Sequence, residues 1–265
     1  MIRRAQPQDV PRIRQLWETC FPDEGGFNDY FFVHFFDCGT VLLSEEQGAL
    51  CAMVQMLPYR LRTGGEEREI TYIYGACTDP VHRRKGHMAR LLEASFALDR
   101  EQGRVASTLI PAEPWLFDFY RLFGYVPFFE VEKREIVRMA DGEAPRRLTQ
   151  TDVPQMAALY DRLTPDCRIV RDAAYWQAQL AMFDALGAGA FGWFAGDMLA
   201  AYAFCWTDHV QEAVGLTPTR EQGLLAALGL ERCTVTGCGT QTALGCIKWH
   251  DKREDSRGYM NLMLN

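Results

Sequence analysis

The residues that could do chemistry gather in one short loop, DPVHRRKGHMA, at residues 79–89. A helical pattern begins inside this loop, so its last amides would lie at a helix N-terminus, where backbone N–H groups have no partner within the helix. Arg83, Arg84 and Lys85 add three positive charges, and Gly86 lets the backbone approach a bulky oxygen closely. The loop therefore predicts a phosphate or diphosphate site. A solvated basic loop is the alternative, because short motifs of this kind recur by chance.

The elements on either side of the loop are a strand and a helix. Residues 86–100 carry an apolar stripe with the period of a helix. Across the first half of the chain, the patterns predict strands at Ile2–Ala5, Thr40–Leu43, Leu50–Arg62, Glu69–Thr78, Arg104–Ile110 and Phe128–Arg138, and helices at Asp9–Thr19, Asp29–Phe36, Gly86–Arg100 and Glu113–Phe123. This order predicts an α/β (α+β) fold in which helices flank a mixed, mostly antiparallel sheet.

The second half of the chain begins like the first. The segment RRAQPQDVP at residues 3–11 recurs as RRLTQTDVP at residues 146–154, a constant offset of 143 residues. The loop-like segment MADGEAP separates the copies. The rest of this half predicts helices at Trp176–Leu186 and Gln222–Leu228 and strands at Ala190–Ala195, Leu199–Trp206, Gln211–Leu216, Cys233–Gly237, Leu244–Trp249 and Tyr259–Leu264. The repeat indicates duplication, so we expect one domain over residues 1–142 and a second over residues 146–265.

The second domain is expected to be degenerate. Its segment PTREQG, at residues 218–223, is a faint copy of the cationic loop. Glu221 and Gln222 stand where the first copy has Arg84 and Lys85, so the positive charge needed for a phosphate is lost.

Composition and charge limit the class of protein. Of the 265 residues, 48% are apolar and 24% charged, the balance of a globular protein, and the formal charge of −7 argues against general nucleic-acid binding. No apolar run approaches the roughly 20 residues of a membrane span, and the N-terminus lacks the apolar segment of a signal peptide. The nine cysteines form no C-x-x-C pair and the five histidines no H-E-x-x-H motif. We therefore expect reduced thiols, a cytoplasmic location, no membrane partner and no metal.

Two runs, YIYGACTDPVHRRKGHMARLL and LIPAEPWLFDFYRLFGYVPF, closely resemble the GCN5-related N-acetyltransferases (GNATs). The acetyl-CoA loop of that family reads R/Q-x-x-G-x-G/A, which Arg83 and Gly86 match, whereas Met88 stands at the last position. The resemblance is strongest to the enhanced intracellular survival (Eis) branch, which implies tandem GNAT domains with a degenerate second copy. The sterol-carrier-like third domain usual in that branch is expected to be missing here.

The resemblance implies acetyl-CoA as co-substrate, with pantetheine on the strand end and pyrophosphate on the loop. The cofactor residues implied are Ala76, Cys77, Thr78, Arg83, Arg84, Lys85, Gly86, His87, Met88 and Ala89. The amide near Cys77 would donate to the thioester oxygen as negative charge develops there.

Tyr120 occupies the position of the family's general acid. A phenol with a pKa near ~10 is protonated at neutral pH and can donate to a leaving thiolate, whose thiol has a pKa near ~8.5. Its place on an apolar helix face is also consistent with a packing role alone. The base stays open: it is water, an unassigned carboxylate or, as the Eis resemblance implies, the C-terminal carboxylate of Asn265. Asp79 is expected to cap its turn instead.

The acceptor is predicted to be a primary amine of a small molecule or peptide. Aromatic side chains are candidates to line its site: Phe27, Tyr30, Phe31, Tyr72 and Tyr74. The sequence thus predicts an acetyl-CoA-dependent N-acetyltransferase that works by direct attack of the amine, and the Eis resemblance suggests a homo-oligomer. The alternatives are a non-catalytic acyl-CoA-binding protein and an interaction protein on a GNAT scaffold.

Overall fold

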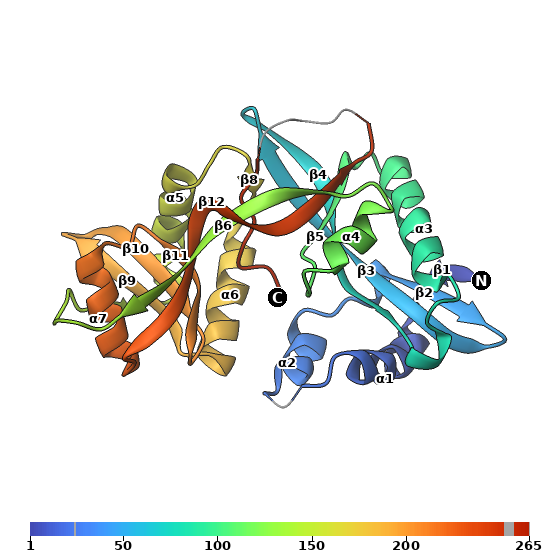
Figure 1. The fold of residues 1–265 in the computed structure, drawn as a ribbon, viewed down its shortest axis with the longest axis horizontal. Coiled ribbons are helices and arrows are strands. Elements are labelled where there is room, and N and C mark those ends of the chain that lie inside the picture. Colours follow the sequence, from blue (N-terminus) through green and yellow to red (C-terminus); the bar gives the residue numbers. More distant parts are fainter. Residues whose placement is uncertain (24, 252–256, 265) are drawn as a thin grey trace. The chain divides into compact units, whose positions relative to one another are not determined.

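The computed structural model describes residues 1–23, 25–251 and 257–264, and the chain divides into two compact units (Figure 1). Unit 1 comprises Met1–Leu61, Glu67–Pro127 and residues 245–251. Unit 2 comprises Arg62–Glu66, Phe128–Leu244 and residues 257–264. The units therefore exchange short segments along the chain, which the sequence did not indicate. The predicted tandem domains, 1–142 and 146–265, stay a prediction.

Unit 1 is a sheet with helices on it. Its helices are α1 (Val10–Cys20), α2 (Phe27–His34), α3 (His87–Glu101) and α4 (Leu116–Arg121), with 3-10 turns η1 (Pro7–Asp9), η2 (Cys38–Thr40) and η3 (Pro80–His82). Its strands are β1 (Ile2–Arg4), β2 (Val41–Glu46), β3 (Ala49–Thr63), β4 (Glu66–Thr78) and β5 (Ala106–Leu109), joined by the last residues of β12 (Arg232–Trp249). The tip of the β3–β4 hairpin belongs to unit 2.

The strand order in unit 1 is β1-β2-β3-β4-β5-β12. The β4–β5 pair is parallel, with α3 as the crossover, whereas β1–β2, β2–β3 and β5–β12 are antiparallel. This confirms the predicted fold class, a mixed and mostly antiparallel sheet flanked by helices. The apolar stripe of α3 covers the sheet as its period requires, since Leu91, Leu92 and Phe96 are buried in one core with Val54 of β3.

A buried carboxylate fastens the C-terminal end of α3. Asp99 is fully buried and accepts hydrogen bonds from Thr71 Oγ1 at 2.5 Å and His250 Nε2 at 3.0 Å. Arg104 Nη1 lies 3.6 Å from the same carboxylate. Because Thr71 is in β4 and His250 follows β12, this one side chain ties the helix to two strands of its sheet.

Unit 2 is also a sheet with helices. Its helices are α5 (Val153–Leu163), α6 (Ala173–Leu186) and α7 (Pro218–Leu228), with the 3-10 turn η4 (Gln150–Asp152). Its strands are β6 (Val126–Val137), β7 (Arg146–Arg147), β8 (Arg168–Ile169), β9 (Gly189–Ala195), β10 (Met198–Cys205), β11 (His209–Val214) and the first part of β12. The order is β12-β11-β10-β9-β7; β11 and β12 are parallel around α7, and β6 pairs with β12. In the part of the chain that the structure describes, no helix has the length and apolarity to cross a membrane.

Three strand predictions in the second half were wrong. Cys233–Gly237 and Leu244–Trp249 are not separate strands, because β12 runs through both without a break and pairs with β6. Tyr259–Leu264 is not a strand: it makes only an isolated bridge, from Tyr259 to Arg168, and Leu262 has a φ of 53°. Its apolar residues are buried, so the pattern reflected burial and not extended structure.

The repeated segments have the same local structure in both units. Arg3 pairs with Asp9 at 2.6 Å, and Arg146, 143 residues later, pairs with Asp152 at 2.7 Å. Each aspartate also accepts the backbone N–H three residues before it, at 2.9 and 2.8 Å, and then a helix begins. Arg3 and the backbone N–H of Gln6 lower the pKa of Asp9 to about 2.

A buried ion pair lies at the centre of unit 2. Arg171 donates to both oxygens of Glu212, at 2.5 and 2.7 Å, and neither side chain is exposed. The phenols of Tyr202 and Tyr259 donate to the same carboxylate at 2.9 and 2.8 Å. Arg171 also donates to the carbonyl oxygen of Asn261 at 2.7 Å, so the pair holds the buried C-terminal segment.

We predict that Arg171→Met will destabilise the protein by about 3–5 kcal/mol, because it leaves the Glu212 carboxylate buried without its cation. The double variant Arg171→Met/Glu212→Gln removes both charges and should lose clearly less. Urea unfolding followed by circular dichroism measures both. Equal losses in the two variants would show that the unpaired charge is not the cause.

Candidate active site

One cavity in unit 1 brings together the strand end, the cationic loop and Tyr120. Its volume is about 870 Å³, within the range of small-molecule sites. It is lined by the end of α1, the end of β4, the loop before α3, the first turn of α3, and α4. The lining residues are Cys20, Phe21, Ala76, Cys77, Thr78, His82, Arg83, Arg84, Gly86, His87, Met88, Ala89, Glu113, Trp115, Leu116, Phe119 and Tyr120.

The cavity exists because β4 parts from β5. The two strands pair only from Ile70 to Tyr72, and three residues later Gly75 has a φ of 55°. A Cβ at Gly75 would lie 2.2 Å from Cζ3 of Trp17, so only glycine fits both the backbone angle and the space. The remaining strand, from Ala76 to Thr78, lines the cavity instead of continuing the pairing.

The loop is shaped to present amides and cations. Asp79 accepts the Val81 N–H at 2.9 Å, which confirms its role as a cap. Arg84 and Gly86 have φ values of 64° and 77°, so the chain turns sharply before α3. The first bond of α3 runs from Arg90 N to Gly86 O at 3.1 Å, and the amides of residues 87–89 precede it. Helix N-termini of this kind bind anions, and residues 83–86 are exposed beside it.

Arg83 and Lys85 differ in their positions. Arg83 Nε donates to the carbonyl oxygen of Thr78 at 3.3 Å, which joins the loop to the strand end. Lys85, unlike the other predicted cofactor residues, is not part of the cavity lining. Its charge adds to the positive field without contact with the cavity.

Tyr120 belongs to both the cavity and the core. Its side chain is 8% exposed and its ring packs against Phe119 and Tyr125, with centroids 5.2 and 5.7 Å away. Burial, with a smaller effect of Cys246, raises the pKa of Tyr120 to about 12. The phenol is therefore protonated at neutral pH. The packing role and the proton-donor role are compatible, because the same side chain is in the core and lines the cavity.

A pair of cysteines in the cavity has no signal in the sequence. Cys20 ends α1 and Cys77 lies near the end of β4, 57 residues apart along the chain. The hydrogen bond with Cys77, aided by Arg83, lowers the pKa of Cys20 to about 7, whereas burial raises the pKa of Cys77. Cys20 Sγ also lies 3.6 Å from the carbonyl oxygen of Thr78. No spacing rule links these residues, since only the packing of α1 on β4 brings them together.

The aromatic residues predicted for the acceptor site form a cluster around Trp17. Phe31 stacks on Trp17 with centroids 4.8 Å apart, and Tyr74 lies 5.4 Å from Phe31. Phe31 and Tyr72 are 0% and 2% exposed. Phe27, Tyr30, Phe31, Tyr72 and Tyr74 are all absent from the lining of the 870 Å³ cavity. Their part in acceptor binding stays a prediction, and Asn265 lies outside the described residues.

In unit 2, the place that corresponds to the cationic loop is filled by the chain itself. The Gln222 side chain accepts the amides of Met139 and Ala140 at 2.7 and 3.1 Å. A Cβ at Gly223 would lie 1.9 Å from the carbonyl oxygen of Glu143. The segment between the repeats therefore packs against α7 at Gln222 and Gly223, within the faint copy of the cationic loop.

Comparison with known proteins agrees with this geometry. Residues 1–128 match the family model of the acetyltransferase (GNAT) domain. No curated protein matches the chain in sequence.

Solved structures share the fold over nearly the whole chain. A probable N-acyltransferase from Enterococcus faecalis has a TM-score of 0.72 and 13% sequence identity to this chain. A GCN5-related N-acetyltransferase from Anabaena variabilis has a TM-score of 0.72 and 15% sequence identity. Eis1 from Mycobacterium abscessus has a TM-score of 0.64 and 15% identity. Each comparison covers 95% of this chain and 73% of the other. Over 95% of its length the chain thus has the fold of solved acetyltransferase structures.

We predict that Gly75→Ala will cost roughly 2–5 kcal/mol, the sum of a left-handed backbone and an overpacked contact with Trp17. Gly64→Ala is the matched control, because Gly64 has a φ of 59° with no heavy atom within 4 Å of its Cβ position. It should lose only about 1–2 kcal/mol in the same unfolding measurement. Losses of equal size would refute the role given to the Trp17 contact.

We predict that alkylation of Cys20 by iodoacetamide will rise about tenfold from pH 6 to pH 8 and then level off, since the thiolate is the nucleophile and its pKa is about 7. Cys77→Ala removes the main cause of the low pKa and should move the profile to higher pH. Peptide mapping by mass spectrometry gives the rate at this one residue. A profile unchanged by Cys77→Ala would contradict the prediction.

Proposed function

We propose that unit 1 is an acetyl-CoA-dependent N-acetyltransferase whose acceptor is a primary amine of a small molecule or peptide. The observation that carries the proposal is the single cavity in which a strand end, a cationic helix N-terminus and a protonated tyrosine meet. The GNAT match of residues 1–128 and the acetyltransferase fold support it.

The cavity offers each part of acetyl-CoA a suitable partner. The amides of residues 87–89, with Arg83 and Arg84, suit the two charges of the pyrophosphate. The exposed backbone from Ala76 to Thr78 suits pantetheine, whose amides can pair with it as an added strand would. Apolar side chains of α4, including Leu116 and Phe119, cover the opposite side.

The reaction is a direct transfer. The lone pair of the neutral amine attacks the thioester carbon, and the Cys77 amide stabilises the oxygen as it becomes negative. The C–S bond then breaks, the sulfur leaves with the electron pair, and Tyr120 gives it a proton. The proton of the attacking amine passes to water or to a carboxylate. The C-terminal carboxylate of Asn265 is the carboxylate that the Eis resemblance suggests.

Unit 2 is proposed to be the degenerate copy. The segment at Met139–Glu143 fills its counterpart of the loop, and Glu221 pairs with Arg134 instead of offering a cation. One active site per chain follows from this assignment.

Two variants separate binding from chemistry. Arg83→Ala/Arg84→Ala should weaken acetyl-CoA binding at least tenfold in calorimetry, because it removes both charges that face the pyrophosphate. Tyr120→Phe should bind acetyl-CoA within about threefold of the wild type but lower kcat roughly 10²–10⁴-fold, the usual contribution of a general acid. Chromatographic assay of CoA release with a panel of polyamines, an aminoglycoside and lysine peptides measures turnover.

Matched controls exclude general effects. Arg60→Ala removes a cation outside the cavity lining, and Tyr125→Phe removes a buried phenol that pairs with Ser107 at 2.6 Å. Both should keep binding and kcat. Wild-type binding without turnover of any amine would favour the non-catalytic acyl-CoA-binding alternative, and no binding at millimolar acetyl-CoA would favour the scaffold alternative.

A further inference from the structure

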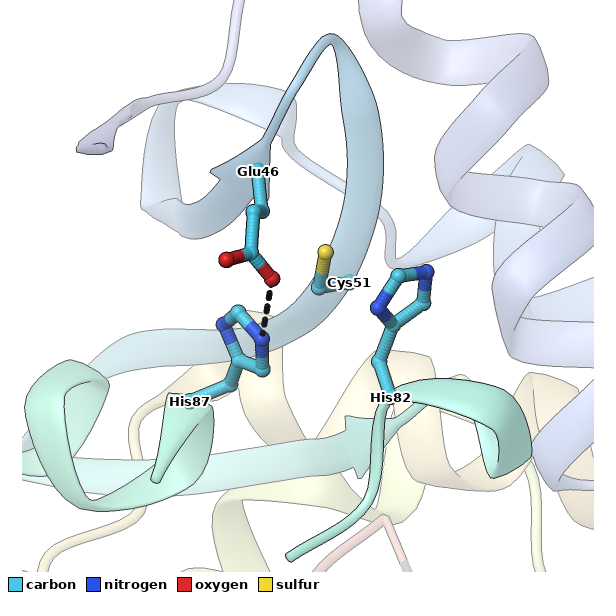
Figure 2. A group of neighbouring side chains, drawn as sticks. All are labelled: Glu46, Cys51, His82 and His87. Atoms are coloured by element: carbon cyan, nitrogen blue, oxygen red, sulfur yellow. Dashed lines mark ion pairs between the residues drawn. The ribbon is translucent and has the colours of Figure 1, made fainter. Parts of the chain in front are cut away.

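Four side chains with metal-binding atoms meet beside the loop (Figure 2). Glu46 ends β2 and Cys51 lies in β3 across the hairpin turn, whereas His82 ends η3 and His87 begins α3. One ligand atom from each residue lies within 4.8 Å of the other three. The sequence prediction of no metal rested on motif spacing, and the fold instead joins two pairs of residues, each five positions apart.

The ring nitrogens that face this cluster have no hydrogen-bond partner among the residues that the structure describes. His87 is 3% exposed and its Nε2 is buried without one; the Glu46 carboxylate is 3.6 Å away, too far for a hydrogen bond. His82 Nδ1 is likewise buried without a partner. A buried polar atom left unpaired costs about 1–3 kcal/mol, so two in one cluster indicate a missing ligand.

The second nitrogen of His87 contacts two polar side chains. His87 Nδ1 lies 2.9 Å from Ser44 Oγ and 3.1 Å from Arg90 Nη2. Because a guanidinium only donates, the Arg90 contact makes Nδ1 an acceptor in the metal-free protein. A metal on Nε2 requires the other tautomer, in which Nδ1 donates to Ser44 and Arg90 turns away.

We propose that Glu46, Cys51, His82 and His87 form a zinc site. Two imidazoles, one thiolate and one carboxylate suit Zn²⁺, whereas Mg²⁺ and Ca²⁺ prefer oxygen ligands alone. Four protein ligands close a tetrahedral shell, so the site is structural. Bond lengths of about 2.0–2.3 Å place neighbouring ligand atoms ~3.3–3.8 Å apart, and the Glu46 and His87 ligand atoms are already 3.6 Å apart. Binding releases the Cys51 thiol proton to solvent.

The site would act on the loop that it brackets. His82 and His87 stand at the two ends of residues 83–86, and Glu46 and Cys51 belong to the β2–β3 hairpin. One ion would therefore fix both ends of the loop to the sheet. If the proposed function holds, a loop that zinc has already ordered loses less conformational entropy when acetyl-CoA binds. Zinc should therefore tighten acetyl-CoA binding, and acetyl-CoA should tighten zinc binding by the same factor. This consequence rests on the proposed function, and zinc binding itself does not.

The test uses the full chain after treatment with EDTA, titrated with Co²⁺ as a spectroscopic probe and then Zn²⁺. One equivalent of Co²⁺ should give the intense visible bands of a tetrahedral ion and a thiolate charge-transfer band, and Zn²⁺ should remove both. Cys51→Ser should abolish the thiolate band, and His82→Gln and Glu46→Gln should weaken binding at least tenfold. Cys38→Ser and His34→Gln are the matched controls and should titrate as the wild type does.

Thermal unfolding gives a second readout and guards against misfolding. Zinc at a hundredfold excess over its Kd should raise the Tm of the wild type by roughly 5–10 °C and that of the three ligand variants far less. Each variant is compared with its own metal-free form, and His82 and Glu46 are partly or fully exposed, so those variants should fold. The proposal is overturned if Co²⁺ gives no thiolate band or if Cys51→Ser keeps the wild-type spectrum.

Measuring the Kd for acetyl-CoA with and without zinc distinguishes the two proposals. A Kd for acetyl-CoA that falls severalfold with zinc supports the role of the site in the loop, and an unchanged Kd overturns that role. Zinc binding with the expected ligand variants, but no acetyl-CoA binding at all, would refute the proposed function and leave the zinc site standing.

Discussion

The candidate site depends on one contact, the close approach of Trp17 to the backbone of Gly75. Gly75 has a left-handed φ three residues after the last β4–β5 pair, and the Trp17 ring occupies the space that a Cβ would need. Beyond Gly75, residues Ala76–Thr78 line the cavity, and α4 supplies the other wall. Glycine is required here for two independent reasons, conformation and space.

Helix α3 connects this site to the core of unit 1. Its apolar face is buried against the sheet, and Asp99 near its C-terminal end is tied to β4 and to the segment after β12. A helix fixed in this way can hold its N-terminal amides at a set position without contacts from a ligand. The loop at that end is exposed and cationic, so the stable and the reactive ends of the same helix are separate.

The same local motif occurs in both units but has different surroundings in each. Both begin with an Arg–Asp pair, a 3-10 turn and a helix, and both place a helix between two parallel strands. In unit 1 the amides at the start of that helix face a cavity. In unit 2 the chain between the repeats packs on the corresponding helix at Gln222 and Gly223, and the buried Arg171–Glu212 pair anchors the C-terminal segment. The same local motif is therefore followed by a helix beside a cavity in unit 1 and by a helix with internal contacts in unit 2.

The sequence by itself determined what depends on neighbouring residues. Sequence patterns located most of the helices and strands, and their order indicated the fold class. The family resemblance of the R-x-x-G loop and the tyrosine helix implied most of the residues that line the cavity. The prediction failed at Tyr259–Leu264, where buried apolar residues resemble a strand pattern, and at β12, which is one strand where two were predicted. Only the tertiary structure decided which side chains meet from distant segments: Cys20 with Cys77, Asp99 with His250, and Glu46 and Cys51 with the two histidines. Such contacts follow from how strands and helices pack, and no spacing along the chain encodes them.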